Sequence, residues 1–424
     1  MSLRSIFNLK KLSVLFCRSR RNFCYSAKRI SARKWLLALF LVLLVSVAFN
    51  SFQLGPTHVL SSPRLNVSTT YHSLTAGNNR TVKTLNATAK GNDGKVKVII
   101  LTYMRSGSTF TGDLFNHHPS VFYLYEPLWM LDFHFKEKEP LLFFNRDLVP
   151  FNASDPSQMT SVQNDVMLTS LSCRFHEMPI QTLKLDWAIQ KSVSCRPYNN
   201  CIRGRSGNQA LISCRPLLQK ACSTASVFVA KTVRLSMKQA ATLLKVDPQV
   251  KVIHLVRDPR GQARSKQYYI RSRQRIAPVR IQEHCSRVLR DLEDSQELKK
   301  QYPGRILTAR YEDLAKSPHD FASRLMDFSG LQMDLALKKY ITSITSAKGK
   351  FNEQVFNTKR KDSDATANRW RVSFEIEYVS MVDDVCKRVY GYMGYLPFAD
   401  GQRMGNLSVP SYKQFRQVPG LWLL

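Results

Sequence analysis

The sequence predicts an α/β fold in which helices cover both faces of a central parallel β-sheet. Short runs rich in Val, Ile and Leu, typical of buried strands, lie at 96–101, 226–230, 251–256 and 305–309. Stretches of helical character separate them at 109–116, 235–244 and 319–328. Strands that alternate with helices pair in parallel and are buried on both faces, which is why the strand runs lack polar alternation.

The N-terminal region predicts a membrane anchor. Residues 1–34 contain ten Lys and Arg and no acidic residue, and the uncharged apolar run that follows extends over 35–54. Twenty residues form a helix of about 30 Å, enough to span a bilayer, and the basic flank keeps the N-terminus in the cytosol. The alternative is a signal peptide cleaved after Ser46–Ala48. A basic region of 34 residues is long for a signal peptide, so we favour a transmembrane signal anchor behind a cytoplasmic tail.

The chain beyond the anchor is expected to be lumenal. Residues 55–95 lack hydrophobic periodicity and predict a flexible stem. Glycosylation requires the secretory pathway, and acceptor sequons occur at Asn66, Asn79, Asn86, Asn152 and Asn406. We therefore expect a glycosylated stem at 55–95, a lumenal domain at 96–400 and a C-terminal tail at 401–424, in a single-pass type II membrane protein of the secretory pathway.

The cysteines predict disulfides in the lumenal domain. Two of the nine, Cys17 and Cys24, lie in the basic tail. The remainder are Cys173, Cys195, Cys201, Cys214, Cys222, Cys285 and Cys386. These cysteines lack the spacing of a zinc site, so disulfides are favoured over metal binding. We therefore expect no metal in this protein. The cysteine-rich segment 171–225 is poor in strand patterns and predicts an insertion pinned by disulfides, with the pairing open and one thiol left over.

The formal charge of +32 predicts an anionic partner. Nucleic acid, a membrane surface, a nucleotide cofactor and an acidic polysaccharide all satisfy it. A lumenal domain excludes nucleic acid, which leaves the other classes.

The first motif with chemical content is Thr102–Phe110, TYMRSGSTF, between the first strand and a helix. The carboxyl ends of parallel strands and the N-termini of the following helices meet at one edge of the sheet, where backbone N–H groups bind anions. Gly107 permits close approach and Arg105 adds positive charge, so the motif predicts a phosphate or sulfate cradle. An ordinary turn with an N-capped helix is the alternative. A P-loop kinase is disfavoured, because no Lys precedes Ser108.

The second motif, Arg257–Ser265, follows the strand run at 251–256. Arg257 at the strand end and Ser265 on the next helix predict a grip on a second phosphate. The alternative is a structural pair between Asp258 and an arginine at the start of the helix.

Together these motifs resemble the two nucleotide-binding signatures of sulfotransferases, and more narrowly the Golgi galactose, N-acetylgalactosamine and N-acetylglucosamine 6-O-sulfotransferases. Within that family the chain is most similar to the keratan sulfate galactose and chondroitin 6-O-sulfotransferases. The resemblance covers about 96–396 and includes the segments 115–129, 214–216, 229–234, 309–318 and 364–371. It implies a P-loop-like sulfotransferase fold.

The resemblance also implies PAPS (3′-phosphoadenylyl sulfate) as the co-substrate. The 5′-phosphosulfate would be held by Arg105, Ser106, Gly107, Ser108, Thr109, Phe110 and Thr111. Arg105 would also stabilise the oxygen that leaves sulfur. The 3′-phosphate would be held by Arg257 and Ser265, with Arg260 in the same set. In-line displacement on sulfur requires neither a metal nor a covalent enzyme intermediate.

Glu126, after the strand-like run 121–125, is the expected base that removes the acceptor proton. A salt bridge or a sugar contact is the alternative for Glu126, and His117 and His118 are the alternative bases. Lys231 is expected to face the same crevice.

The segment Arg369–Arg371 is expected to support the nucleotide or an anionic acceptor through its two arginines, with Trp370 in the core. The acceptor remains open among the 6-hydroxyls of galactose, N-acetylgalactosamine and N-acetylglucosamine, in a glycan or a glycosaminoglycan. A catalytically inactive, polyanion-binding relative is the alternative function. Association of two copies of the chain into a homodimer is also left open.

Overall fold

The computed structural model describes residues 94–137, 139–144, 148–149, 155–184, 187–270, 274–349 and 357–423. The predicted cytoplasmic tail, the anchor and all but the last two residues of the stem lie outside these ranges, and so do Cys17, Cys24 and the sequon at Asn152. Over the described ranges, no helix is long and apolar enough to cross a membrane.

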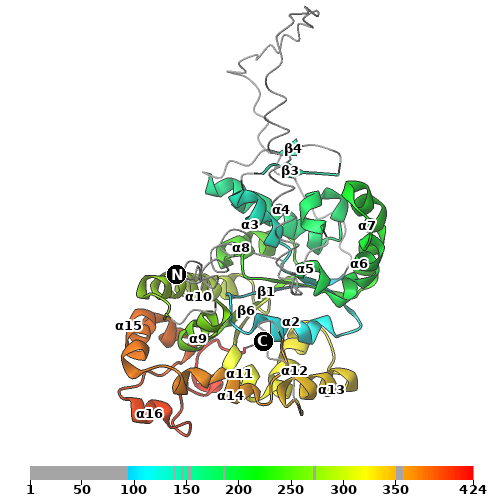
Figure 1. Cartoon of the computed structure of the whole chain (residues 1–424). Helices are drawn as coiled ribbons and strands as arrows, with labels where there is room; N and C mark the ends of the chain where they lie inside the picture. The colour runs from blue at the N-terminus through cyan, green and yellow to red at the C-terminus, as the bar shows by residue number, and fades with distance from the viewer. Residues whose placement is uncertain are drawn as a thin grey trace, which may run out of the picture. The chain divides into compact units, whose positions relative to one another are not determined.

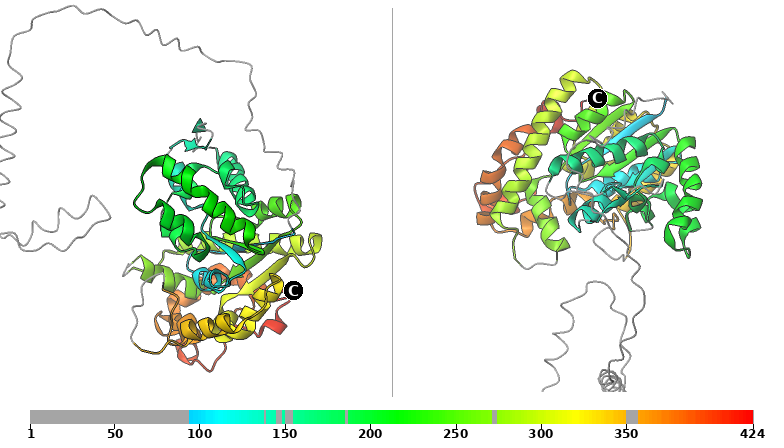
Figure 2. Two further views of the ribbon diagram at one scale, coloured as in Figure 1. Left: turned by 90° about the vertical axis from the view of Figure 1, so that its right-hand side faces the viewer. Right: turned by 90° about the horizontal axis from the view of Figure 1, so that it is seen from above.

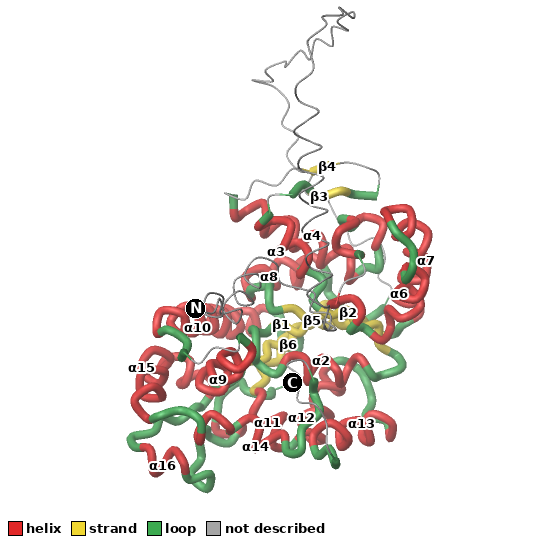
Figure 3. The backbone as a smooth tube through the Cα atoms, viewed as in Figure 1, coloured by secondary structure: helices red, strands yellow, loops and turns green. Residues whose placement is uncertain are grey.

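A five-stranded, wholly parallel sheet forms the centre of the domain (Figures 1 and 3), which confirms the predicted class. The strand order is β2-β5-β1-β6-β7. The strands are β1 (Val96–Leu101), β2 (Val121–Tyr125), β5 (Val227–Thr232), β6 (Val250–Val256) and β7 (Ile306–Arg310). The chain leaves β1 toward β2 on one side and later returns to β6 on the other, so the carboxyl end of β1 lies at the switch point where ligands bind in such sheets. A short antiparallel pair, β3 (Leu141–Leu142) and β4 (Leu148–Val149), stands apart from this sheet.

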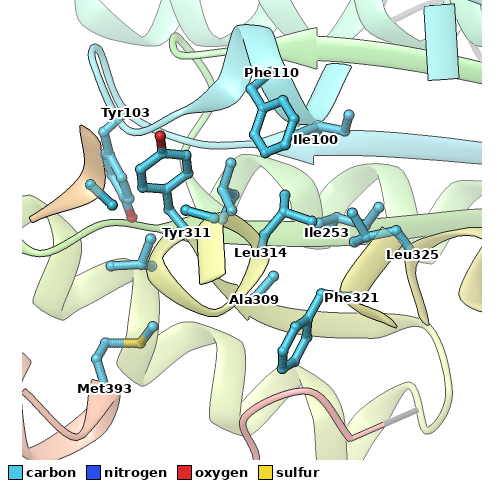
Figure 4. Packing of buried hydrophobic residues seen from close by; sticks show 14 of the residues in the cluster. Ile100, Tyr103, Phe110, Ile253, Ala309, Tyr311, Leu314, Phe321, Leu325 and Met393 are labelled. Atoms are coloured by element: carbon cyan, nitrogen blue, oxygen red, sulfur yellow. The ribbon is translucent and has the colours of Figure 1, made fainter. Parts of the chain in front are cut away.

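Alternate residues of each central strand enter two separate cores. In β1, Val98 and Ile100 point into one hydrophobic cluster, and Ile99 and Leu101 point into the other. Because both faces are buried, every residue of β5 is buried as well. Figure 4 shows part of the first cluster. The continuous apolar runs in the sequence therefore reflect a sheet with no solvent-exposed face.

Helices cover both faces of the sheet (Figures 1 and 2). Buried residues of the first cluster come from α2 (Ser108–Asn116), α9 (Pro259–Tyr269), α10 (Pro278–Gln301), α11 (Tyr311–Lys316), α12 (Pro318–Phe328), α13 (Leu335–Thr345), α14 (Ser363–Ala367), α15 (Ile376–Met393) and α16 (Gly401–Gly405). Those of the second cluster come from α3 (Trp129–Lys136), α4 (Pro156–Leu171), α6 (Arg196–Ile202), α7 (Gly207–Thr224) and α8 (Met237–Val246), together with Leu298 of α10. The short α5 (Trp187–Gln190) contributes to both. The observed α2, α8 and α12 agree with the predicted helices to within two residues.

Two disulfides close the segment 171–225, which confirms the predicted disulfide-pinned insertion. They join Cys173 to Cys222 and Cys201 to Cys214. A third, Cys285–Cys386, ties α10 to α15. Among the described cysteines, the thiol outside these disulfides belongs to Cys195, which is buried, and burial raises its pKa to about 12. It is therefore neither charged nor accessible in the folded domain.

The C-terminal residues that we expected to form a tail pack onto the domain. Trp422 is 1% exposed, its backbone N–H donates to the carbonyl of Thr308 in β7 (2.9 Å), and its indole N–H donates to Asp313 (2.9 Å). Its ring contacts Phe321 with centroids 4.6 Å apart. Burial of this indole accounts for the packing of the chain end beside β7.

Candidate active site

A cavity of about 480 Å³ opens at the carboxyl ends of the sheet strands. Each of the five strands supplies or precedes one of its lining residues: Arg105 after β1, Glu126 after β2, Lys231 in β5, Arg257 after β6 and Tyr311 after β7. Residues far apart in the sequence therefore meet because the parallel strands end along one edge.

The loop between β1 and α2 is a tight turn. The N–H of Ser106 donates to the carbonyl of Tyr103 (3.1 Å), and both Arg105 (φ 69°) and Gly107 (φ 82°) lie in the left-handed region. A Cβ atom on Gly107 would approach the Tyr311 ring to 2.1 Å, so only glycine fits at this position. Gly107 provides no side-chain cap for α2. The N-terminus of α2, with its partial positive charge, therefore forms part of the cavity wall without a side-chain cap over it.

The predicted cradle residues divide into two groups. Those that line the cavity are Arg105, Gly107, Ser108, Thr109 and Phe110. Ser106 and Thr111 are fully buried behind them, and the Thr111 hydroxyl donates to the carbonyl of Gly107 (3.4 Å). The Thr111 side chain therefore supports the loop from behind, whereas the buried Ser106 hydroxyl has no hydrogen-bond partner among the described residues.

The two sequence motifs are joined by direct hydrogen bonds. Arg105 Nε donates to the hydroxyl of Ser265 (3.0 Å), and Arg257 Nη1 donates to the carbonyl of Arg105 (3.0 Å). The Arg105 guanidinium also lies over the Tyr269 ring, 5.5 Å from its centroid. Burial and the nearby charges of Arg257 and Arg360 lower the pKa of Arg105. A bound anion would relieve this repulsion between cations.

Arg257 is a buried cation. It is 8% exposed, and its Nε has no hydrogen-bond partner among the described residues. The nearest carboxylate oxygen, from Glu312, is 4.0 Å from Nε. Burial and the nearby Asp258 raise the pKa of Glu312 to about 7, although the positive charge of Arg257 opposes the shift. Because a buried cation requires compensation, Arg257 is suited to hold an anionic group in the cavity.

Arg260 does not line the cavity. Its guanidinium is fully buried and donates to Asp258 (2.7 Å), Asp383 (3.2 Å) and the carbonyl of Leu396 (2.9 Å). It also lies 4.3 Å from the ring centroid of Trp370. All these contacts are within the domain core, so we remove Arg260 from the nucleotide-binding set and assign it to the structural pair that was the alternative for this motif.

Glu126 lines the same cavity directly after β2, also with a left-handed backbone (φ 50°). Its carboxylate accepts hydrogen bonds from Lys231 (2.6 Å), Arg234 (2.5 Å) and the N–H of Val233 (3.4 Å). Left-handed non-glycine residues concentrate at functional sites, where the surrounding structure holds them in place. Lys231 and Arg234 therefore hold the Glu126 carboxylate in a defined position on the cavity wall.

Glu126 is the only carboxylate among the described lining residues, and none of these is a histidine. The alternative bases lie elsewhere. His117 is exposed and stacks on Tyr340, with centroids 3.8 Å apart, while His118 is buried with its ring near the carbonyl of Gln332 (3.2 Å). The structure thus places one predicted base in the cavity and two outside it.

The three residues of the segment Arg369–Arg371 also differ in position. Arg369 lines the cavity, Trp370 lines it while remaining 1% exposed, and Arg371 turns away to donate to the carbonyls of Met404 (2.8 Å) and Asn406 (2.7 Å). Sequence reasoning missed several lining side chains, among them Trp129, Trp187, Arg234, Tyr268, Tyr269 and Arg360. Only Arg234 carried a usable signal, because it follows Lys231 at the end of a strand.

Over the described ranges, no group of three or more His, Cys, Asp and Glu side chains could hold a metal ion. The lining instead combines Arg105, Lys231, Arg234, Arg257, Arg264, Arg360 and Arg369 with the single carboxylate of Glu126. Such a surface can bind a multiply charged anion and place it beside the carboxylate of Glu126.

The family comparison agrees with this arrangement. The sulfotransferase family matches residues 97–334, which include both basic motifs, Glu126 and Lys231. The chain therefore belongs to the sulfotransferase family, a family of group-transfer enzymes.

Its curated relatives are named carbohydrate sulfotransferases. Carbohydrate sulfotransferase 4 of Mus musculus is 26% identical over 74% of this chain and 85% of its own length, and carbohydrate sulfotransferase 6 of Homo sapiens is 27% identical over 75% and 85%. A solved structure of a mouse sulfotransferase complexed with PAP matches 70% of this chain and 83% of its own length, at 11% identity and a TM-score of 0.35.

Proposed function

We propose that this protein transfers a sulfuryl group from PAPS to the 6-hydroxyl of a galactose, N-acetylgalactosamine or N-acetylglucosamine residue in a glycan or glycosaminoglycan. The observation that carries the proposal is the convergence of two basic motifs and one carboxylate on a single cavity. Membership of the sulfotransferase family and the names of the curated relatives support the reaction and the carbohydrate acceptor. The 6-position rests on the resemblance of the sequence motifs.

The residues present fit an adenylate that carries two separate anionic groups. The N-terminus of α2 and Arg105 would hold the 5′-phosphosulfate, because backbone N–H groups and the helix dipole favour an anion there. Arg257 and Ser265 would hold the 3′-phosphate, which would give the unpartnered Nε of Arg257 an acceptor. PAPS supplies the sulfuryl group that is transferred.

In the proposed transfer, the acceptor oxygen forms a bond to sulfur while the bond from sulfur to the bridging oxygen breaks. The acceptor proton passes to Glu126, and the negative charge that develops on the departing phosphate oxygen is stabilised by Arg105. Lys231 and Arg234 orient the Glu126 carboxylate. No further co-reactant is required, because the products are the sulfated sugar, PAP and the proton.

We further propose that the enzyme is a single-pass type II protein of the Golgi membrane, anchored by 35–54 with the domain in the lumen. The apolar stretch after a basic tail supports this orientation. So do the three disulfides, since disulfides persist in oxidising compartments. The sequon asparagine Asn406 is exposed, as glycosylation requires. Protease protection in sealed microsomes tests the orientation: the domain should be protected, and digestion without detergent would contradict it.

The experiment for the activity uses the full-length protein in detergent with ³⁵S-labelled PAPS. The acceptors are oligosaccharides of the keratan and chondroitin type and an N-acetylglucosamine-terminated glycan. Label at a 6-hydroxyl is the expected result. Binding of PAP without transfer to any acceptor would favour the second candidate, an inactive polyanion-binding relative, for which the cationic cavity wall is the supporting observation. The elution volume of the same preparation tests whether two copies associate.

A further inference from the structure

A wall of three aromatic rings adjoins Glu126 in the cavity, and the hydroxyl of one of them, Tyr125, lies 3.4 Å from the hydroxyl of Thr109 in the anion cradle. Tyr125, Trp129 and Trp187 all line the cavity. Trp187 meets the other two rings at interplanar angles of 72°, with centroids 5.6 Å from Tyr125 and 5.3 Å from Trp129. Tyr125 directly precedes Glu126 and ends β2, so this wall begins where the proposed base is located.

Cations cover two of the three rings. Lys231 Nζ lies 4.4 Å from the ring centroid of Tyr125, and the Arg234 guanidinium lies 4.7 Å from that of Trp129. These are the same two cations that bind the carboxylate of Glu126. The aromatic wall and the base are therefore parts of one cluster, held together by cation–π contacts and salt bridges.

Trp187 reaches this cluster from the disulfide-pinned insertion. It begins α5, in which Ala188 and Ile189 are 3% and 4% exposed, whereas Trp187 itself is 38% exposed. An indole that keeps more than a third of its surface accessible on a cavity wall is poorly explained by core packing alone. It is well placed to be covered by a bound molecule.

The insertion is fixed to the site by hydrogen bonds along the edge strand. β2 pairs with β5 on one side only, and hydroxyls of the insertion bond to its other edge. The N–H of Tyr125 donates to Ser192 (3.1 Å), and the N–H of Tyr123 donates to Ser194 (2.9 Å), whose hydroxyl donates back to the Tyr123 carbonyl (3.0 Å). These bonds hold the segment after α5 against the strand that ends at Glu126.

A second anchor joins the same segment to the cradle helix. The side-chain amide of Asn116, the last residue of α2, donates to the carbonyl of Lys191 (2.9 Å) and accepts from the N–H of Val193 (2.8 Å). The position of Trp187 is thus defined relative to both the anion cradle and the base. A binding surface held this firmly loses little conformational entropy when it is covered.

We propose that Trp187 is a specificity-determining residue that stacks against the pyranose ring of the acceptor and presents its hydroxyl to Glu126. This inference rests on the proposed function. One face of a pyranose carries C–H groups, and covering an indole with that face removes apolar area from water, while the hydroxyl groups point to the sides. The nucleotide is a less suitable ligand for Trp187 than the sugar. The groups suited to its two anions lie around Arg105 and Arg257, where the two sequence motifs are hydrogen-bonded to each other.

The test compares Trp187→Ala with the full-length wild type. The acceptor KM is expected to rise about tenfold, as loss of one aromatic stacking contact predicts. The dissociation constant for PAP and the melting temperature are expected to stay unchanged, and Trp187→Tyr should recover most of the acceptor affinity. Phe133→Ala is the matched control, since Phe133 is 47% exposed on neighbouring α3 and does not line the cavity.

Saturation-transfer NMR with keratan-type and chondroitin-type oligosaccharides gives a readout that does not depend on turnover. Loss of the sugar signal in Trp187→Ala, with PAP binding intact, supports the proposal. An unchanged acceptor KM or sugar signal overturns it, and so does weaker PAP binding with normal sugar binding, which would assign Trp187 to the nucleotide. Failure of the proposed function is a different result: the wild type would bind these sugars without sulfating them.

Discussion

Replacement of Arg257 by Lys should weaken PAP binding about 30-fold. Arg257 is 8% exposed, donates to the carbonyl of Arg105 (3.0 Å) and has a buried Nε without a hydrogen-bond partner among the described residues. Lys keeps the positive charge beside Glu312 but cannot donate from two nitrogens at once. Loss of one charge-assisted hydrogen bond in a buried site costs about 2 kcal/mol, which corresponds to about a 30-fold change.

Isothermal titration with two ligands assigns this effect to the 3′-phosphate. PAP and adenosine 5′-phosphate differ only in that group, so the variant should lose affinity for PAP and retain its affinity for adenosine 5′-phosphate within about threefold. The exposed Arg416→Lys is the control for a nonspecific effect of exchanging Arg for Lys. If both ligands weaken equally, Arg257 acts by shaping the cradle loop through the Arg105 carbonyl. If neither weakens, the assignment of the 3′-phosphate is refuted.

Three further changes probe the fold around the site. Gly107→Ala should abolish PAP binding, because its Cβ would lie 2.1 Å from the Tyr311 ring, and Gly107→Ala with Tyr311→Ala should recover part of it if overlap is the cause. His284→Phe should reduce the pH dependence of stability, to which the buried His254 contributes in the same direction. Burial lowers the pKa of His284 to about 3, so the unfolded chain binds one more proton between about pH 6.5 and that value, and acidification costs about 1.4 kcal/mol per pH unit. Urea unfolding at several pH values measures the slope, and an unchanged slope would exclude His284 as a contributor. Double replacement of Cys285 and Cys386 by Ala should lower stability by about 4–5 kcal/mol, because the bond closes a loop of 101 residues. A melting temperature equal to that of the wild type would contradict this.

Much of the fold follows from local sequence patterns. The apolar runs at 96–101 and 251–256 predicted β1 and β6 because strands buried on both faces contain few polar residues. The same patterns placed Arg105 and Arg257 at one edge of the sheet, since parallel strands end together. Their hydrogen bond connects motifs separated by about 150 residues, and the sheet topology alone makes it possible.

Contacts made by distant elements could not be predicted. Arg260 lies two residues after Asp258 in the second motif, and no local pattern there distinguishes a phosphate ligand from a core ion pair. Its partners Asp383 and Leu396 come from α15 and the segment after it. Trp187 likewise carries no local signal, because its position depends on hydroxyls of the insertion that bond to the edge of β2. Cysteine pairing required the three-dimensional fold for the same reason.

Sulfate transfer by the wild type and by Glu126→Gln, measured side by side, tests the central claim most directly. Gln preserves the shape of the side chain but cannot accept the acceptor proton, so turnover should fall by about 10²- to 10⁴-fold. PAP affinity should be unchanged, and melting curves will report any cost of losing the contacts to Lys231 and Arg234. Labelled sugar from the wild type, and almost none from a folded, PAP-binding variant, is the predicted result. Equal turnover by the two proteins would contradict the account.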